Sequence, residues 1–156
     1  MEERKIVTSV LVYGYDELPE AYKMLVDAAK AATRNSYAPY SKFNVGAAIL
    51  LENGEIVSGT NQENAAYPSG ICAERTTLFY ASASRPGKPM AALAIAACQG
   101  GELVGEPVTP CGACRQVMAQ YQLKSGMPMR ILLVGAHKIW EFAKVEDLLP
   151  LMFDSI

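Results

Sequence analysis

Ser69-Gly70-Ile71-Cys72-Ala73-Glu74-Arg75 is the stretch around which this sequence is organised, and Pro110-Cys111-Gly112-Ala113-Cys114-Arg115 is its counterpart. Each segment opens a predicted helix, so three thiols and one carboxylate lie at the tips of two helices. Three thiolates can hold a zinc ion and leave its fourth tetrahedral position open for water. The Glu74 carboxylate, two residues after the first thiol, is then placed to move a proton of that water.

The spacing of the thiols and arginines supports one metal site. Cys111 and Cys114 are three residues apart, so a helix places both on one face, and Cys72 completes a set of three. A helix N-terminus favours the thiolate that zinc requires. Three thiolates outweigh the charge of Zn²⁺ by one, so we expect a guanidinium nearby. Arg75, three residues after Cys72, is favoured on geometry, and Arg115 is the alternative, although each also suits a surface position.

Other interpretations of the cysteines remain open at this point. A CxxC pair alone is typical of a redox site or of half a structural zinc site. A redox pair leaves Cys72 and Glu74 unexplained. A closed structural site needs a fourth ligand, which Cys98 or His137 would have to supply. Cys98 lies in an apolar run and His137 in a predicted loop, so we favour the open site.

The composition indicates a globular chain that acts on small molecules. Its 156 residues fit a single domain over 1–156, with 51% hydrophobic residues and a mean hydropathy of +0.10. These values suggest surface buried against a partner chain, although abundant alanine raises them too. The net charge is -2 and no basic run occurs, so we expect no nucleic-acid partner.

The sequence also carries no targeting pattern. The first residues lack the apolar core of a secretory signal, and no apolar run approaches the length of a membrane span. We therefore expect no membrane association and a cytoplasmic location, where thiols stay reduced.

The hydrophobic pattern predicts alternating helices and strands. Segment 5–13 suits either an edge strand or a mobile arm. The remaining segments are expected to form a helix at 18–35, hairpin strands at 44–51 and 56–61, a helix at 72–84, a buried strand at 91–98, a helix at 111–121, strands at 130–135 and 139–144, and a helical turn at 145–149. This order favours an α/β fold with a sheet covered by helices.

From Tyr22 to Phe153 the sequence resembles the short, single-domain cytidine deaminase family. The thiol and carboxylate pattern is also the general signature of zinc deaminases. The motifs that carry the resemblance occur in this order: Phe43-Asn44-Val45-Gly46-Ala47-Ala48, Asn61-Gln62-Glu63-Asn64-Ala65-Ala66-Tyr67-Pro68, Gly70-Ile71-Cys72-Ala73-Glu74-Arg75-Thr76, Pro110-Cys111-Gly112-Ala113-Cys114-Arg115-Gln116-Val117 and Leu148-Leu149-Pro150.

The resemblance implies a fold, a reaction and an assembly. The implied fold has three α-β-α layers, with a mixed five-stranded sheet and helices on both faces. The implied reaction is the zinc-dependent hydrolysis of cytidine and 2′-deoxycytidine to the uridines, a step of pyrimidine salvage. Cys72, Cys111 and Cys114 would hold Zn²⁺, Glu74 would carry protons, and the chain would form a homotetramer.

The resemblance also implies which residues contact the nucleoside. Asn61 and Glu63 would hold the sugar hydroxyls, Phe43 would pack on the pyrimidine, and the backbone around Ala73 would contact its amide edge. Phe153 would reach the pocket of a neighbouring subunit. Taken by themselves, Asn61 and Glu63 favour a role as strand-end caps and Phe43 suits core packing, whereas Phe153 equally suits a tail residue that anchors its own domain.

The sequence departs from the family in three places, and other functions stay open. Asn44 replaces a common Pro, residues 1–17 form a longer extension without an assigned role, and the Gly-rich segment 99–109 leaves the pocket rim undefined. The alternatives are a deaminase of another aminopyrimidine nucleoside, such as a nucleoside antibiotic, an inactive zinc-stabilised binding module, and, disfavoured by charge, a nucleic-acid editor.

Overall fold

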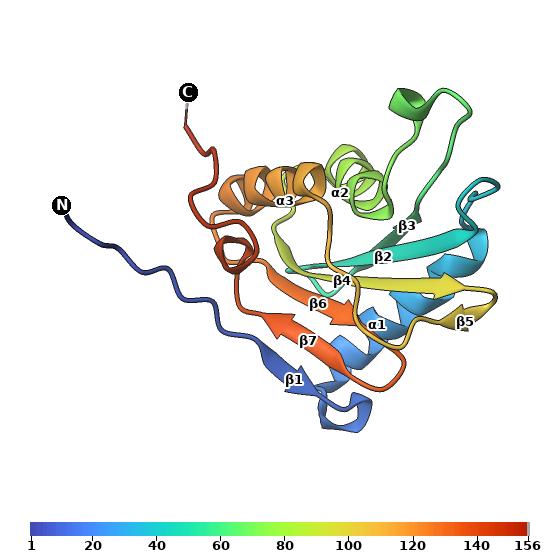
Figure 1. Cartoon of the computed structure of the whole chain (residues 1–156), viewed down its shortest axis with the longest axis horizontal. Coiled ribbons are helices and arrows are strands. Elements are labelled where there is room, and N and C mark those ends of the chain that lie inside the picture. Colours follow the sequence, from blue (N-terminus) through green and yellow to red (C-terminus); the bar gives the residue numbers. More distant parts are fainter. Residues whose placement is uncertain (156) are drawn as a thin grey trace.

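The computed structural model describes residues 1–155, in which helices cover both faces of one mixed β-sheet (Figure 1). The helices are α1 (Glu20–Ala32), α2 (Ala73–Ser84) and α3 (Gly112–Ser125). The strands are β1 (Leu11–Tyr13), β2 (Phe43–Leu51), β3 (Ile56–Thr60), β4 (Met90–Gln99), β5 (Glu102–Leu103), β6 (Arg130–Val134) and β7 (Ile139–Phe142). Short 3₁₀ turns occur at Tyr15–Glu17, Thr33–Asn35, Tyr67–Ser69 and Val145–Asp147.

The sheet has the order β1-β7-β6-β4-β2-β3, with β5 paired to the end of β4. β4 pairs parallel with β6 and antiparallel with β2, so the predicted mixed α/β sheet is confirmed. The predicted number of five strands is wrong, because the described residues form seven. β1 adds to the edge of β7, and the short β5 follows Gly100 and Gly101, whose φ angles of 64° and 90° permit the reversal.

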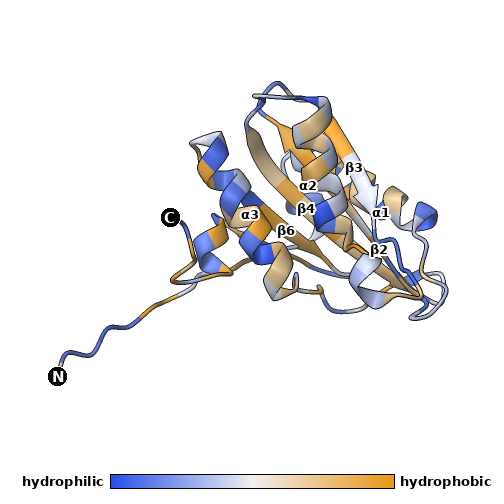
Figure 2. Ribbon diagram, turned by 90° about the horizontal axis from the view of Figure 1, so that it is seen from above, coloured by the Kyte–Doolittle hydropathy of each residue, from blue (hydrophilic) through white to orange (hydrophobic). Residues whose placement is uncertain are grey.

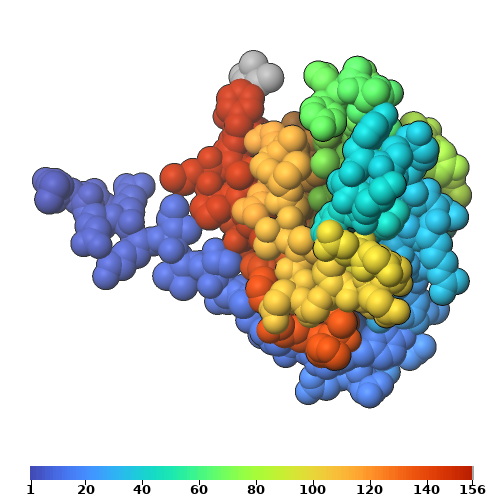
Figure 3. Space-filling model, turned by 45° about the vertical axis from the view of Figure 1, so that its right-hand side comes forward, coloured from blue at the N-terminus to red at the C-terminus, as the bar shows by residue number. Residues whose placement is uncertain are grey.

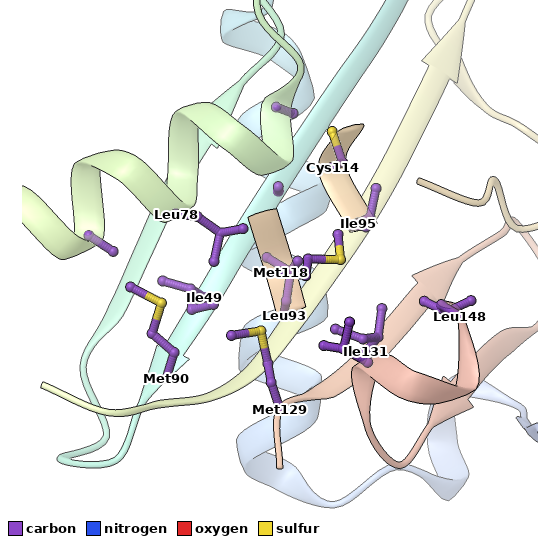
Figure 4. Packing of buried hydrophobic residues seen from close by; sticks show 14 of the residues in the cluster. Ile49, Leu78, Met90, Leu93, Ile95, Cys114, Met118, Met129, Ile131 and Leu148 are labelled. Carbon is purple, nitrogen blue, oxygen red and sulfur yellow. The ribbon is translucent and has the colours of Figure 1, made fainter. Parts of the chain in front are cut away.

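Two hydrophobic layers explain why the central strands are apolar without interruption. Residues facing α2 and α3, such as Ile49, Leu93 and Ile131, form one buried cluster (Figure 4). Their neighbours along the strands, such as Ala94 and Leu132, pack against α1 on the other face. A sheet covered on both faces needs apolar side chains at successive positions, since these point alternately to either side.

Two glycines let the helices approach the sheet closely. A Cβ atom at Gly46 would lie 2.2 Å from the Ala29 carbonyl oxygen of α1. A Cβ atom at Gly59 would lie 2.7 Å from the Thr77 hydroxyl of α2. Both distances are far below a van der Waals contact, so these glycines fix how deeply α1 and α2 sit on β2 and β3.

The third helix is longer than the sequence pattern predicted. It continues past 121 to Ser125 and ends at Gly126, whose φ of 66° is the left-handed conformation of a helix C-terminus. Gln122 breaks the apolar pattern, yet it is buried. Its side-chain oxygen accepts hydrogen bonds from the backbone N–H groups of Met129 and Val145, so a polar residue anchors the last turn.

Residues 1–10 extend away from the body as an exposed arm (Figures 1 and 3). The predicted strand at 5–13 is therefore limited to its last three residues. One contact ties this arm to the C-terminal segment, since the Thr8 hydroxyl donates to the Asp147 carbonyl oxygen at 3.0 Å.

Hydrophobic residues are gathered on the central strands between the helices, as the colouring of Figure 2 shows. Within residues 1–155, every helix is too short or too polar to cross a membrane.

Candidate functional site

The N-termini of α2 and α3 bring the three predicted metal-binding thiols together. Cys72 is the N-cap residue of α2, and Cys111 is the N-cap residue of α3. Cys114 lies in the first turn of α3, fully buried at one end of the core cluster (Figure 4). Both helix N-termini therefore direct their partial positive charge toward the same group of sulfur atoms, which favours thiolates there.

The distances between the sulfur atoms fit a single zinc ion. The Cys72 and Cys111 Sγ atoms are 3.9 Å apart, and those of Cys111 and Cys114 are 3.4 Å apart. All three lie within 4.8 Å of one another. Zinc–sulfur bonds of about 2.3 Å at tetrahedral angles separate sulfur atoms by about 3.8 Å. The cluster therefore needs little rearrangement to hold this ion.

The two residues considered as a fourth ligand lie elsewhere. Cys98 is on β4, and its thiol donates to the Thr33 hydroxyl at 3.4 Å on the α1 side of the sheet. His137 is exposed in the turn between β6 and β7. Among residues 1–155, the side chains close enough to share one metal ion at this cluster are Cys72, Cys111 and Cys114. This geometry leaves the fourth position to a ligand from outside the chain.

Replacing Cys98 with Ser is expected to leave the zinc content at one ion per chain. The thiol contacts Thr33 on the far side of the sheet and a serine hydroxyl can take over that contact. Metal analysis of the purified variant after dialysis checks this expectation. A loss of zinc from Cys98→Ser would instead indicate a closed site with four thiolates.

Hydrogen bonds within the cluster divide the protons unequally between the thiols. The pKa of Cys72 falls to about 5, chiefly because its sulfur accepts a hydrogen bond from Cys114 and secondly from Arg75. The same contact with Cys72, together with burial, raises the pKa of Cys114. The pKa values of the two thiols therefore shift in opposite directions, and Cys72 is the thiol that loses its proton first.

Arg75 and Arg115 occupy different environments. The Arg75 Nη2 atom lies 3.7 Å from the Cys72 sulfur, and the guanidinium thus sits beside the thiol cluster. Arg115 donates instead to the carbonyl oxygens of Pro110 at 2.8 Å and Leu148 at 2.7 Å. Arg115 therefore ties α3 to the C-terminal segment, and Arg75 is the cation placed to draw charge from a thiolate.

Glu74 is a buried carboxyl group next to the thiols. It is 5% exposed, and it follows Ala73 in the first turn of α2. Burial raises the pKa of the Glu74 carboxyl, and the negative charge of Cys72 raises it further. A carboxyl group with a raised pKa exchanges protons near neutral pH more readily than an exposed glutamate does.

A cavity of about 280 Å³ connects these groups with the other predicted site residues. Phe43, Asn61, Glu63, Cys72, Ala73 and Glu74 all line it, together with Ser41, Val45, Ile95, Val108 and Thr109. A wider depression of about 510 Å³ adjoins it and shares four residues with it, namely Ser41, Asn61, Glu63 and Cys72. In Figure 3, the segments around residues 40, 65 and 110 lie next to one another on one face of the molecule. The volume suits a ligand of nucleoside size.

The Asn61 side chain is already engaged within the protein. Its Oδ1 atom accepts hydrogen bonds from the Ser36 hydroxyl at 2.5 Å and the Val45 N–H at 2.9 Å. Its Nδ2 atom donates to the Phe43 carbonyl oxygen at 2.9 Å. An amide group has two N–H hydrogens, so one donor remains for a ligand.

The Glu63 carboxylate holds the turn before β2. Its Oε2 atom accepts from the backbone N–H groups of Tyr40 at 2.9 Å and Ser41 at 3.2 Å, and its Oε1 atom accepts from the Ser41 hydroxyl. These hydrogen bonds, the Ser41 hydroxyl first, lower the pKa of Glu63. The group therefore faces the cavity as an anion that accepts hydrogen bonds.

Phe153 is the predicted substrate-binding residue that lies away from the cavities of its own chain. Phe153 is 67% exposed, and its carbonyl oxygen accepts from the Gln116 side chain at 2.7 Å. In the described part of the chain, its side chain is not among those that line either cavity.

Three residues that line the smaller cavity were not predicted from the sequence, namely Ser41, Val108 and Thr109. The position of Thr109, two residues before Cys111, was the one available signal.

Comparisons with known proteins agree with this geometry. Residues 19–127 match the family described as the cytidine and deoxycytidylate deaminase zinc-binding region. The chain is similar to a cytidine deaminase of Sporosarcina psychrophila, with 43% identity over 84% of this chain and 90% of that one. It is also similar to a cytidine deaminase of Halalkalibacterium halodurans, with 46% identity over 63% of this chain and 70% of that one. The crystal structure of cytidine deaminase from Burkholderia pseudomallei superposes with a TM-score of 0.70 and 41% identity, over 83% of this chain and 97% of that one.

Proposed function

The chain belongs to the cytidine and deoxycytidylate deaminase family, and we propose that it is a hydrolase that converts cytidine and 2′-deoxycytidine to the uridines with release of ammonia. One observation carries this proposal. Three thiols at two helix N-termini lie beside the buried carboxyl of Glu74, in a cavity that also holds Asn61 and Glu63. The reaction would serve pyrimidine salvage.

Zinc is the metal of this site, since the family region is a zinc-binding one and the three-thiol cluster fits the ion. We assign Cys72, Cys111 and Cys114 as its ligands. When bound, zinc supplies the nucleophile by lowering the pKa of water. Arg75 draws negative charge from the Cys72 sulfur, which offsets the excess of three thiolates over one divalent ion.

We assign the proton transfers of the reaction to Glu74. Water adds to C4 of the pyrimidine and ammonia leaves, so one proton must reach ring N3 and another must reach the departing amine. The Glu74 carboxyl lines the cavity and has a raised pKa, so it can accept a proton and then release it. Both protons come from the attacking water. A single buried carboxyl can serve both transfers, because it returns to its starting state each time it accepts one proton and releases it.

The remaining cavity residues are assigned to substrate binding. Phe43 packs on the pyrimidine, the backbone around Ala73 contacts its amide edge, and Asn61 and Glu63 read the sugar hydroxyls. Because the side chain of Phe153 is exposed, we assign it to the pocket of a neighbouring copy in a homotetramer. We further infer one deaminase domain over residues 1–156, with 1–17 as an extension, and a cytoplasmic location.

Replacing Arg75 with Gln is expected to lower kcat about 10- to 100-fold with a modest loss of zinc affinity. This range is typical of residues that contact metal ligands, and here the lost charge leaves Cys72 without its cationic partner. Steady-state kinetics and metal analysis check it, with Arg34→Gln, an exposed arginine on the other side of the sheet, as the matched control. An unchanged rate in Arg75→Gln would remove the proposed role of this charge.

Incubating the purified zinc-loaded protein with cytidine tests the proposed function. We expect uridine and ammonia to form in equal amounts, and no turnover at full zinc occupancy would contradict the proposal. Parallel reactions with cytosine and with an aminopyrimidine nucleoside antibiotic measure the substrate range. A marked preference for the antibiotic would favour the alternative substrate class.

A further inference from the structure

The Ser41 hydroxyl connects two residues that face the cavity from different segments. It donates a hydrogen bond to the Oε1 atom of Glu63, which lies in the polar run after β3. It also accepts a hydrogen bond from the backbone N–H of Phe43 at 3.0 Å, at the start of β2. Ser41 lines both the 280 Å³ cavity and the wider depression beside it. None of the roles assigned above uses this residue.

The direction of these hydrogen bonds is fixed by the donors available. A hydroxyl has one hydrogen, and the Phe43 N–H can only donate, so the Ser41 hydrogen must point to Glu63. The resulting chain runs from Phe43 through Ser41 to Glu63, and each hydrogen bond in such a chain polarises the next. Glu63 can therefore act only as an acceptor toward anything in the cavity.

Counting acceptor positions shows where a ligand can bind to Glu63. A carboxylate offers about four lone-pair positions, two on each oxygen. The N–H groups of Tyr40 and Ser41 occupy both positions on Oε2, and the Ser41 hydroxyl occupies one on Oε1. One acceptor position remains, and it lies on the oxygen that Ser41 holds. A donor from the ligand and the Ser41 hydroxyl therefore share the same atom.

We propose that Ser41 is a positioning residue, through which Glu63 selects nucleosides that carry a 3′-hydroxyl. This inference rests on the proposed function, which assigns Glu63 to the sugar. Without the Ser41 hydroxyl, the two backbone N–H groups still hold Oε2, but Oε1 loses the partner that aims its free lone pair. The carboxylate can then turn about its own axis, and the sugar hydroxyl meets a poorly oriented acceptor.

Binding of a product pair that differs in one hydroxyl tests this proposal without requiring turnover. Calorimetry gives the Kd of 2′-deoxyuridine and of 2′,3′-dideoxyuridine for the wild-type chain and for Ser41→Ala. We expect the wild type to favour the hydroxyl-bearing product about 10- to 100-fold, as for a hydrogen bond to a charged group. In Ser41→Ala, this ratio should fall to about one- to threefold, with the Kd of the dideoxy product nearly unchanged.

Three further variants separate positioning from a general loss of structure. Ser41→Thr keeps the hydroxyl and should therefore show the wild-type ratio of the two Kd values. Ser58→Ala removes an exposed serine hydroxyl on β3 and should leave both Kd values unchanged. In Glu63→Gln, the amide oxygen would be held by the two backbone N–H groups, and the amide nitrogen offers no acceptor. Adding Ser41→Ala to Glu63→Gln should therefore produce no further loss.

Several outcomes would overturn the proposal. These are an unchanged ratio in Ser41→Ala, a wild type that binds both products equally or not at all, and an equal weakening of both products. Deamination of cytidine by the wild type is measured separately. A chain that deaminates cytidine but keeps its ratio in Ser41→Ala refutes the role of Ser41 alone, whereas absence of turnover refutes the proposed function.

Discussion

Glu74→Gln is expected to keep its zinc and its fold and to lose turnover of cytidine by about 10²- to 10⁴-fold or more. Groups that transfer protons in the transition state contribute about this much, and Glu74 is assigned to more than one transfer. Glutamine has the same shape but cannot accept and release a proton. Because Glu74 is 5% exposed, water has little access to take over the role.

Kinetics of the variant must be measured at a metal content equal to that of the wild type. Glu52→Gln, which changes an exposed glutamate at the hairpin turn, provides a matched control and should keep the full rate. Substrate affinity should change less than kcat, since the proton transfers belong to the chemical step. Activity of Glu74→Gln near the wild-type value would remove Glu74 from the mechanism.

Cys114→Ala is expected to abolish zinc binding and to lower the melting temperature by about 8–16 °C in zinc-containing buffer. A ligand present at about a thousand times its Kd stabilises a protein by about 4 kcal/mol. For a chain of this size, each kcal/mol corresponds to about 2–4 °C. The variant should still fold, because most of the apolar core on both sheet faces lies away from the cluster.

Thermal denaturation with and without a chelator isolates the contribution of the metal. The wild type should lose stability on chelation, whereas Cys114→Ala should not respond. Cys98→Ser should respond as the wild type does, because its thiol lies on the opposite side of the sheet. A chelator response in Cys114→Ala would mean that the ion binds elsewhere or that two thiols suffice to hold it.

The sequence pattern predicted the fold class because strands that are buried on both faces of a sheet are apolar at successive positions. The apolar runs of β2, β4 and β6 and the start of α2 and α3 at a cysteine could be found directly. The pairing of β1 with β7 could not, because three residues of edge strand have no distinctive period. The last turn of α3 was missed because Gln122 is buried through hydrogen bonds rather than through apolarity.

The residues of the candidate site that belong to a short motif could be predicted from the sequence. The residues that a loop supplies could not. The thiols and Glu74 lie within two short segments with ligand spacing. The helical spacing of Arg75 from Cys72 favoured this arginine as the partner of the thiols, but Arg115, directly after Cys114, remained an alternative. The structure separates them through the carbonyl groups that Arg115 binds. Ser41 gave no signal, since a serine in a turn has many structural uses.

We propose that the chain provides three sulfur ligands and leaves the fourth zinc position open beside Glu74, and the reaction depends on this open position. X-ray absorption at the zinc edge of the purified protein measures this directly. We predict three sulfur atoms at about 2.3 Å and one oxygen atom at about 2.0 Å. A fourth sulfur, or a nitrogen from His137, would contradict the account, because no position would remain for the water that the reaction consumes.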